Sequence, residues 1–320
     1  MVVVPEAENR NQLPSLENGT GGAFALSCNE LQLFNSRGYI GPFDVIDQES
    51  LQKLRSTFDK ILSGRLRSPI YGRTTHRDWH LYYRNLMSMV YRPEVIERVK
   101  SLLGENLLVW RTSIFHKGPA DGGLDWHQSS LFAGEEYGLF KPALMPPEDY
   151  ELYSDLFNVS VWIALDDVTT DNGAMQIAVG THTRQYPVRK VPLMDSVFGK
   201  VFKNNLDRTG DSDRWEELSK RYACDTIFDP DAEGAKIDTI LMRAGQAIIF
   251  TDRVLHGSLP NVTPDQRRLA INFRVTIPEV EVYPHRRHGD MVDGNDHNIE
   301  KHACVMLTGS DAHGKNVYLN

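Results

Sequence analysis

The sequence predicts a mainly β fold, made of antiparallel strands with helical cover. Short segments rich in β-branched and aromatic residues recur after residue 105, several of them alternate apolar with polar positions, and Gly, Pro, Asn or Asp residues bound them. These segments are residues 106–117, 158–167, 237–244, 246–252 and 268–277. The clearest helical periodicity lies earlier in the chain. We therefore expect the later strands to form sheets that the earlier helices cover.

Two helices are expected in the first third of the chain. Asp47 is a suitable N-cap for the first helix, because its carboxylate can accept hydrogen bonds from the backbone N–H groups of the opening turn. The apolar residues of this helix share one face, and Gly64 ends it; they are Leu51, Leu54, Phe58, Ile61 and Leu62. A shorter helix follows Pro93 and is closed by Gly104.

The chain is organised as one domain that follows an arm. Residues 1–26 are polar and rich in Gly and Asn without sustained periodicity, so we expect a flexible N-terminal arm. No shift of composition divides residues 27–320, which we interpret as a single catalytic domain. The segments 132–157 and 180–236 are long for the loops of a compact domain, and such loops are often lids or binding segments. Residues 215–222 could add a helix within the second of them.

The composition argues against several classes of function. The chain has 320 residues, a formal net charge of −8 and an isoelectric point near 5.8, whereas nucleic-acid binding requires a basic face. No apolar stretch reaches the roughly 18 residues that a membrane helix requires, and the N-terminus lacks the pattern of a signal peptide. Cys28, Cys224 and Cys304 are too widely spaced for a metal or redox motif. We expect a cytoplasmic protein that binds neither nucleic acid nor a membrane.

Two histidines carry the strongest chemical signal. His127 lies in DWHQSS (125–130) and His256 lies in VLHGS (254–258). A single histidine on a strand is usually structural, but two histidines and one carboxylate that bind one face of iron(II) form the facial site of many oxygenases. The carboxylate normally lies two residues after the first histidine, where extended side chains point to the same face. Here that position is Ser129, a neutral hydroxyl, so one position of the predicted metal site is open.

The order of the segments around these histidines resembles the phytanoyl-CoA dioxygenase-like branch of the iron(II)/2-oxoglutarate oxygenases over about residues 31–285. The matching segments include FNVSVWIALDDVTTDNGAMQIAVGTH, AGQAIIFTDRVLHGS and PNVTPDQRRLAINFRV. Within this branch, GYIGPFDVID, LLVWRTSIFHKGPADGGLDWHQ and RVTIPEVEVYPH are most similar to the chlorinating enzymes of natural-product biosynthesis. The resemblance implies an enzyme with a double-stranded β-helix, the jelly-roll or cupin-like fold.

The resemblance also implies the cofactors and the reaction. Iron(II) would be held by His127 and His256, and 2-oxoglutarate and O2 would be consumed as the substrate is oxidised. The chlorinating enzymes have Ala or Gly in place of the metal carboxylate, so that chloride restores the missing charge and the missing ligand. Ser129 at this position predicts a halogenase that chlorinates an unactivated aliphatic carbon. The alternatives are a hydroxylase with a two-histidine iron site, completed by water or Ser129, and an inactive binding protein of the same fold.

Other carboxylates could replace the missing ligand. Asp125 lies two residues before the first histidine and Asp252 lies four before the second, so alternation can place each on the face of its histidine. A facial site depends on the local turn after the first histidine, so we interpret Asp125 as a loop group outside the metal site. Asp252 is interpreted as a partner that orients a histidine or a pocket water. Glu135 and Glu136 are interpreted as solvated charges.

An Arg one strand after the second histidine holds the distal carboxylate of 2-oxoglutarate in this family, because a guanidinium pairs with a carboxylate through two hydrogen bonds. Arg267 and Arg268 are the candidates. Alternation puts them on opposite faces of a strand, so only one can point inward. The spacing in the wider family favours Arg267, whereas the chlorinating enzymes favour Arg268.

Four further residues receive roles from the resemblance. Arg274 shares the parity of Arg268 and could join a polar network near the halide, and the hydroxyl of Ser160 could support chloride or its water. Phe115 and Trp162 are expected to pack on the co-substrate. Each of these residues could equally be an ordinary residue of the barrel.

The chlorinating enzymes commonly act on aminoacyl groups tethered to carrier proteins, so we expect either a small-molecule substrate or a carrier-protein-tethered aminoacyl substrate. A positive patch in the second long loop would suit an acidic carrier protein or its phosphopantetheine; it comprises Arg184, Arg189, Lys190, Lys200 and Lys203. The segment GRTTHRDWH could instead contact an anionic substrate through Arg73, His76, Arg77 and His80, or it could be structural.

Overall fold

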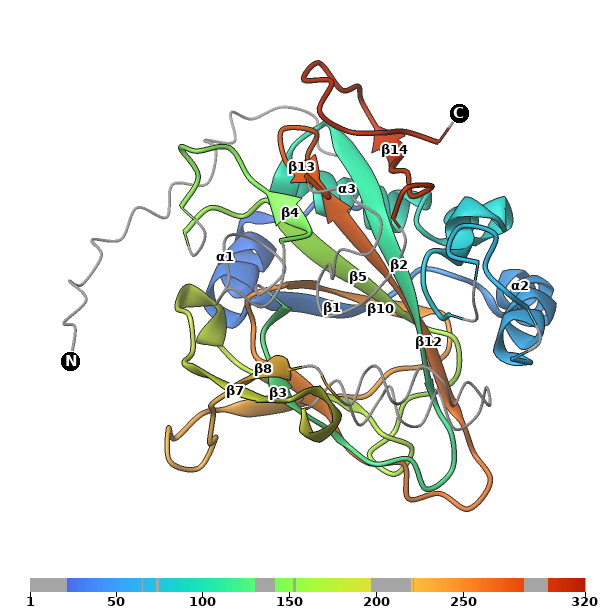
Figure 1. Ribbon diagram of the computed structural model, residues 1–320, viewed down its shortest axis with the longest axis vertical. Coiled ribbons are helices and arrows are strands. Elements are labelled where there is room, and N and C mark those ends of the chain that lie inside the picture. The colour runs from blue at the N-terminus through green and yellow to red at the C-terminus, as the bar shows by residue number, and fades with distance from the viewer. Residues whose placement is uncertain are drawn as a thin grey trace.

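The computed structural model consists of two antiparallel sheets with helices on the outer side of the larger sheet (Figure 1). It describes residues 22–64, 66–72, 75–129, 142–151, 154–196, 220, 222–284 and 299–319. Trp162 and Ala270 of the larger sheet pack in one buried cluster with Ile177 of the smaller sheet. The predicted mainly β fold with helical cover is therefore confirmed.

The larger sheet has six strands, and each pair of neighbours is antiparallel. Their order across the sheet is β1 (Tyr39–Asp44), β10 (Gln246–Thr251), β5 (Asn158–Ala164), β12 (Arg268–Thr276), β2 (Leu107–Lys117) and β14 (Val305–Thr308). The predicted segments 106–117, 158–167, 246–252 and 268–277 contain four of these strands. The prediction of these strands from alternation and turn residues is confirmed.

The smaller sheet has four strands and carries both histidines. Their order is β3 (Leu124–His127), β11 (His256–Ser258), β6 (Met175–Ala178) and β9 (Ile237–Ile240). Strands β3 and β11 are neighbours, although about 130 residues separate them in the chain. This pairing is what brings the two histidine motifs together.

The side chains of β12 contribute to a different buried cluster on each face of the larger sheet. Leu269, Ile271 and Phe273 face outward and belong to the buried cluster that the helices cover. Ala270 faces the smaller sheet and belongs to the cluster that contains Trp162. Because side chains alternate along a strand, Arg268 and Arg274 share the inward face with Ala270. The inner face of this central strand therefore carries positive charge into the space between the sheets.

Within the described residues, three α-helices cover the fold: α1 (Cys28–Arg37), α2 (Gln48–Leu62) and α3 (Pro93–Leu103). Asp47 caps α2, accepting the N–H of Ser50 at 2.7 Å, and Gly104 is the C-cap of α3, so both predicted helices are confirmed. The part of the chain that the structure describes also forms short 3-10 helices: η1 (Trp79–Leu81), η2 (Arg84–Met89), η4 (Thr181–Thr183) and η5 (Leu193–Asp195). In the part of the chain that the structure describes, none of the helices combines the length and apolarity needed to span a membrane.

The packed fold begins earlier than the sequence indicated. Residues 1–21 of the predicted arm lie outside the described residues, but Leu26 is buried and its N–H donates to Ser101 Oγ at 3.0 Å. Helix α1 follows at once, and Ser27 and Glu30 form its capping box. The last residues of the predicted arm are therefore part of the domain, held against α3.

The two segments predicted as long loops contain strands. In the first, β4 (Leu144–Met145) pairs with β13 (Glu281–Val282), while residues 130–141 and 152–153 lie outside the described structure. In the second, β7 (Val188–Pro192) pairs with β8 (Tyr222–Thr226). Tyr222 is thus in a strand, which contradicts the end of the helix predicted over 215–222; residues 197–219 and 221 are not described.

Gly245, in the turn before β10, lies against the backbone of Ile46, which precedes α2. Its φ is +93°, and a Cβ there would lie 2.1 Å from the carbonyl oxygen of Ile46. Gly245→Ala should therefore lower the free energy of unfolding by about 2 kcal/mol or more. Gly234→Ala is the matched control, since Gly234 also has a positive φ but its Cβ would meet no atom within 4 Å. Urea unfolding curves measure both; equal losses would contradict the steric argument.

Candidate active site

The two histidines lie directly opposite each other on neighbouring strands. His127 ends β3, and its Cα partner across the ladder is His256, the first residue of β11. Their ring centroids are 4.2 Å apart, with a tilt of 50° between the planes. Both side chains are buried, and Phe250 of β10 packs on His256 with ring centroids 5.1 Å apart. Two imidazoles held this closely can bind one metal ion from adjacent strands.

Backbone hydrogen bonds fix the tautomer of both rings. Nδ1 of His127 lies 3.0 Å from the carbonyl oxygen of Asp125, and Nδ1 of His256 lies 2.9 Å from that of Val254. A carbonyl only accepts, so each Nδ1–H is the donor, and Nε2 is the nitrogen that can coordinate. Metal-bound histidines in proteins are typically oriented in this way.

Burial keeps both imidazoles neutral. It lowers the pKa of His127 to about 4, although the hydrogen bond to the Asp125 carbonyl opposes the change. Burial and the neighbouring His127 hold the pKa of His256 well below its usual value. Because a neutral imidazole is the form that binds metal, this pair fits a divalent transition metal without further deprotonation.

Ser129 occupies the position where a facial site has its carboxylate. It is buried, and its N–H donates to the backbone carbonyl of Asp252 at 2.8 Å. Within the described ranges, no third His, Cys, Asp or Glu joins the two histidines in a metal-binding group. The side chain of Asp125 is exposed, and Glu135 and Glu136 lie outside the described residues. The described structure thus contains a two-histidine site without a carboxylate ligand.

The positive charge of Arg274 acts on both histidines. Arg274 is buried on the inner face of β12, directly across the ladder from Ser160, and its positive charge lowers the pKa of both His127 and His256. Ser160 accepts a hydrogen bond from Asn272 Nδ2 at 3.2 Å. Burial lowers the pKa of Arg274 to about 9, so it remains charged at neutral pH. A positively charged side chain therefore lies near the histidines.

Asp252 is a buried carboxyl group that interacts electrostatically with Arg274. Its carboxyl is buried, which raises its pKa, while Arg253 and Arg274 oppose the shift. Its side chain also bonds to Asn158 and lies 3.3 Å from Thr251 Oγ1. Asp252 is therefore coupled to Arg274 rather than to either histidine.

Arg267 and Arg268 point to opposite faces, as alternation predicts. Arg267 forms ion pairs with Asp59 and Asp166, both at 3.2 Å, on the outer side of the sheet. Arg268 is buried on the inner face, 5.6 Å from the ring centroid of Trp162, and its Nε has no hydrogen-bond partner among the described residues. A buried guanidinium with an unsatisfied N–H fits the distal carboxylate of a dicarboxylic acid. Arg268 is thus the inward candidate.

Trp162 and Phe115 share the inward face with Arg268. Trp162 is buried, whereas Phe115, which pairs with Ala270, is 36% exposed. Trp162 lies beside Arg268, and Phe115 is placed on this face by its pairing with Ala270. The structure therefore places Trp162 beside Arg268, and Arg274 near the histidines, whereas Arg267 points to the other face.

Sequence reasoning missed three residues that hold the site. Gln128 donates to the carbonyl of Arg253 at 2.6 Å and accepts the N–H of Tyr186 at 3.0 Å, which fixes the residue between His127 and Ser129. Lys117 donates to Ser258 Oγ at 2.9 Å. Gln128 and Ser258 are in the quoted motifs, but their roles depend on partners far along the chain.

The segment GRTTHRDWH is mainly structural where it is described. His80 is fully buried beside β2, where its Nδ1 lies 2.8 Å from Thr112 Oγ1, and Asp78 accepts the N–H of Thr112 at 2.7 Å. Arg77 contributes to the positive charge that acts on Arg274, while Arg73 lies outside the described residues. His80 is therefore not available to contact a substrate.

The predicted positive patch is only partly described. Arg184 is paired with Glu233 and Tyr186, and Lys200 and Lys203 lie outside the described residues. Arg189 and Lys190 are exposed on β7, and Lys190 lies over the ring of Tyr222. Arg189 and Lys190 are consecutive residues of a strand, so their side chains point to opposite faces.

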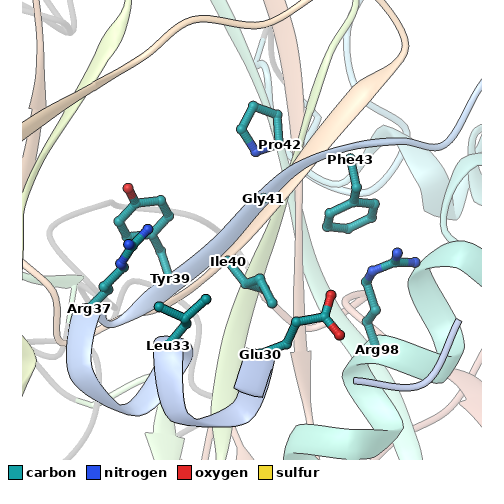
Figure 2. A pocket seen from close by; sticks show the side chains of 9 residues that line it. All are labelled: Glu30, Leu33, Arg37, Tyr39, Ile40, Gly41, Pro42, Phe43 and Arg98. Atoms are coloured by element: carbon teal, nitrogen blue, oxygen red, sulfur yellow. The ribbon is translucent and has the colours of Figure 1, made fainter. Parts of the chain in front are cut away.

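A surface cleft of about 250 Å³ lies between α1, β1 and α3, and it contains neither histidine (Figure 2). Figure 2 shows the guanidinium of Arg98 beside the ring of Phe43, with the carboxylate of Glu30 nearby. Its other lining residues are Leu33, Arg37, Tyr39, Ile40, Gly41 and Pro42. The chemical groups of the candidate active site therefore lie elsewhere, between the two sheets.

Comparison with known proteins agrees with this geometry. The family model for phytanoyl-CoA dioxygenase (PhyH) matches residues 34–269. The chain is 26% identical over 192 residues to a probable alpha-ketoglutarate-dependent hypophosphite dioxygenase of Stutzerimonas stutzeri, covering 60% of this chain and 53% of that protein. It is 21% identical over 262 residues to the peroxisomal phytanoyl-CoA dioxygenase of Homo sapiens, covering 76% of this chain and 66% of that protein. The chain thus spans about half to two thirds of the length of these relatives.

Solved structures show the same fold. CytC3 with Fe(II) and alpha-ketoglutarate is 26% identical and superimposes with a TM-score of 0.65, covering 92% of this chain and 93% of that chain. The non-heme monooxygenase ThoJ is 20% identical and superimposes with a TM-score of 0.59, covering 90% of this chain and 85% of that chain. The predicted jelly-roll fold is therefore confirmed. Since the family model also matches most of the sequence, the chain belongs to the phytanoyl-CoA dioxygenase (PhyH) family, whose relatives are iron(II)- and 2-oxoglutarate-dependent oxygenases.

Proposed function

We propose that the protein is an iron(II)/2-oxoglutarate-dependent halogenase that chlorinates an unactivated aliphatic carbon. The observation that carries the proposal is the pair of neutral, oriented histidines with the hydroxyl of Ser129 at the carboxylate position. A carboxylate ligand would supply one negative charge and one donor atom, and chloride supplies both. The resemblance of the surrounding motifs to the chlorinating enzymes supports the same conclusion.

The residues of the site divide into three roles. His127 and His256 would hold iron(II), which, with 2-oxoglutarate and O2, supplies the oxidising power to remove a hydrogen atom from the substrate. Arg268 would pair with the distal carboxylate of 2-oxoglutarate, with Trp162 beside it. The positive charge of Arg274 and the hydroxyl of Ser160 would stabilise chloride in the space next to Ser129. Phe250 excludes water from one side of His256.

A second candidate is an oxygenase that hydroxylates its substrate. It is favoured by Asp252, a buried carboxyl coupled to Arg274 and joined through its backbone to Ser129. An ionised Asp252 would offset the charge of Arg274 and weaken the attraction for chloride. Water would then complete the site, and hydroxylation would follow. An inactive binding protein is less well supported, since such a protein has no need of two oriented histidines and a buried Arg268.

Ser129→Asp distinguishes the two enzymes before any substrate is known. The variant should still give the visible charge-transfer band of an iron(II) and 2-oxoglutarate complex under anaerobic conditions, but the band should lose its response to chloride. The added carboxylate occupies the open position and repels the halide, so apparent chloride affinity should fall by about 100-fold or more. Ser129→Ala is the matched control and should keep the response. A wild-type band that chloride does not change would support the oxygenase and contradict halogenation.

We propose that the substrate is a small molecule or an aminoacyl group tethered to a carrier protein. Arg189 and Lys190 support the second form, because exposed cations on β7 suit the acidic surface of a carrier protein. The test is binding of carrier-loaded and free aminoacyl compounds to the wild type and to an Arg189→Glu, Lys190→Glu variant. We expect the variant to lose binding of the carrier-loaded compound and to keep binding of the free one. Equal binding of the carrier-loaded compound by the wild type and the variant would contradict carrier docking.

A further inference from the structure

Three arginines gather on the inner face of the larger sheet. Arg274 on β12 is the Cα partner of Arg111 on β2. Ser113 lies two residues after Arg111, on the same face of β2, and forms an isolated antiparallel bridge with Arg77. Residues directly opposite each other in antiparallel strands point to the same face. The three arginines therefore occupy two neighbouring rows of the inner face.

A β-bulge and an aromatic ring hold the two central guanidinium groups. The register between β2 and β12 shifts directly after Arg274, and Trp110 is the extra residue of β2. The guanidinium carbon of Arg111 lies 4.4 Å from a ring centroid of Trp110, and that of Arg274 lies 5.7 Å from it. Nε of Arg111 also donates to the hydroxyl of Tyr283 at 3.1 Å. Two buried guanidinium groups thus lie on one indole.

Positive charge exceeds negative charge at this position. Burial lowers the pKa of Arg111 and of Arg274, and the charge of Arg77, which is half-buried, lowers both further. The carboxylates that oppose these shifts are Asp78 for Arg111 and Asp252 for Arg274. In the described part of the chain, three guanidinium groups therefore act here against two carboxylates.

Both carboxylates also serve other groups. Asp78 accepts a hydrogen bond from the hydroxyl of Tyr71. Burial raises the pKa of Asp252, and its charge is shared between Arg253 and Arg274. Buried cations without full counter-charge are costly, and guanidinium groups bind the oxygens of a carboxylate or a phosphate in pairs. The excess of cations is therefore suited to the anionic group of a ligand.

Asn272 adds a neutral acceptor to the same face. It lies two residues before Arg274 on β12 and is buried, and its Nδ2 donates to Ser160 Oγ at 3.2 Å. Its Oδ1 is buried and has no hydrogen-bond partner among the described residues. A buried acceptor without a donor is unfavourable. This oxygen is therefore suited to an N–H or O–H group of the same ligand, as an amino acid or a nucleotide would supply.

One row of the sheet connects the cations with the histidines. Phe250 on β10, Ser160 on β5, Arg274 on β12 and Arg111 on β2 are successive Cα partners. Phe250 packs on His256 at the first end of this row. Neighbouring strands are about 4.8 Å apart, so the backbone positions at the two ends are about 14 Å apart. A small molecule whose anionic group lies at Arg111 could extend to the metal site.

We propose that the substrate is a free small molecule with a carboxylate or phosphate group, and that Arg77 and Arg111 bind this group with the charge of Arg274 beside them. The inference rests on the proposed oxidation of a substrate at the two histidines. It selects the free form of the substrate, because an aminoacyl thioester has lost the carboxylate that these cations would bind. Arg268 lies at the other end of β12, so this site is separate from that of the co-substrate.

The test uses the anaerobic complex with iron(II) and 2-oxoglutarate, whose visible band responds to ligands that bind beside the metal. The panel contains L-amino acids, their carboxamides and their N-acetylcysteamine thioesters, and nucleoside 5′-monophosphates with the matching nucleosides. At least one acid or phosphate should change the band with a Kd about 10-fold or more below that of its neutral counterpart. The responding class identifies the anion as carboxylate or phosphate. A response to thioesters or other neutral compounds alone would overturn the proposal.

Arg77→Met tests the cations directly, since Arg77 is half-buried and its removal spares the packing around Trp110. The Kd of the anionic ligand should rise by about 10-fold or more, whereas that of its neutral counterpart should change by less than about 3-fold. Arg243→Met is the matched control, because it removes an exposed arginine and changes the net charge equally. Equal Kd values of the anionic ligand for the two variants would overturn the proposal.

Selenate tests the site before any substrate is known. Crystals of the same complex soaked in selenate should show an anomalous selenium peak beside Arg77 and Arg111 in the wild type, and Arg77→Met should lose it. The absence of the peak, or its survival in Arg77→Met as an adventitious ion only, would overturn the proposal. The absence of any visible band in the wild type would instead contradict the proposed function, and the selenate peak would still report on the anion site.

Discussion

Replacing His256 with alanine should lower the affinity for iron(II) by about 100-fold or more and abolish turnover. The residue supplies one of the two neutral imidazoles, and no described carboxylate lies close enough to replace it. Anaerobic calorimetry with the metal-free protein measures the loss directly. Iron(II) should raise the melting temperature of the wild type and have no such effect on His256→Ala, since a ligand stabilises only a protein that binds it.

His182→Ala is the matched control for this substitution. His182 is also a buried histidine with a pKa lowered to about 4, but it lies in η4 and contacts the carbonyl of Asn35 through Nε2. Its loss should cost stability and leave the affinity for iron(II) unchanged within about 3-fold. Iron binding that survives in His256→Ala and is lost in His182→Ala would contradict the assignment of the metal site.

Arg268→Leu should weaken the binding of 2-oxoglutarate by about 100-fold, whereas Arg267→Leu should change it by less than about 3-fold. Removal of one partner from a buried, hydrogen-bonded charge pair typically costs 2 kcal/mol or more. Arg267 lies on the other face and contributes only partly exposed ion pairs, which are worth about 0–1 kcal/mol of stability. Anaerobic titrations of the two variants with 2-oxoglutarate check the prediction.

The adjacent positions make this a strict comparison. Both variants remove one guanidinium from the same end of β12, so a general effect of net charge would alter them equally. If Arg267→Leu instead weakened the binding of 2-oxoglutarate more than Arg268→Leu, the inner face of β12 would not hold the co-substrate.

The central strands could be predicted because their sequences alternate or are continuously apolar. The residues of β5 and β12 are buried throughout, and their β-branched side chains gave a clear signal. The pair β7 and β8 was missed, because β7 is mostly exposed and lacks an apolar face. Helix α1 buries only Leu31 and Phe34, so its periodicity was weak, although the capping box at Ser27 was visible in the sequence.

The site was predictable where chemistry depends on residue type and spacing. The histidines, Ser129 and the opposite faces of the Arg pair follow from the motifs and from alternation. The choice between Arg267 and Arg268 required the sheet, because only tertiary packing determines which face is inward. Lys117 could not be recognised, since its acceptors include residues about 140 positions away in the chain.

The most direct test of the account is a crystal structure of the anaerobic complex with iron(II), 2-oxoglutarate and bromide, with diffraction data collected at the bromine absorption edge. Bromide is an anomalous scatterer that takes the place of chloride. The account predicts an anomalous peak bonded to the metal between His127, His256 and Ser129. Water or the carboxylate of Asp252 at that position, without a bromide peak, would contradict halogenation and favour the oxygenase.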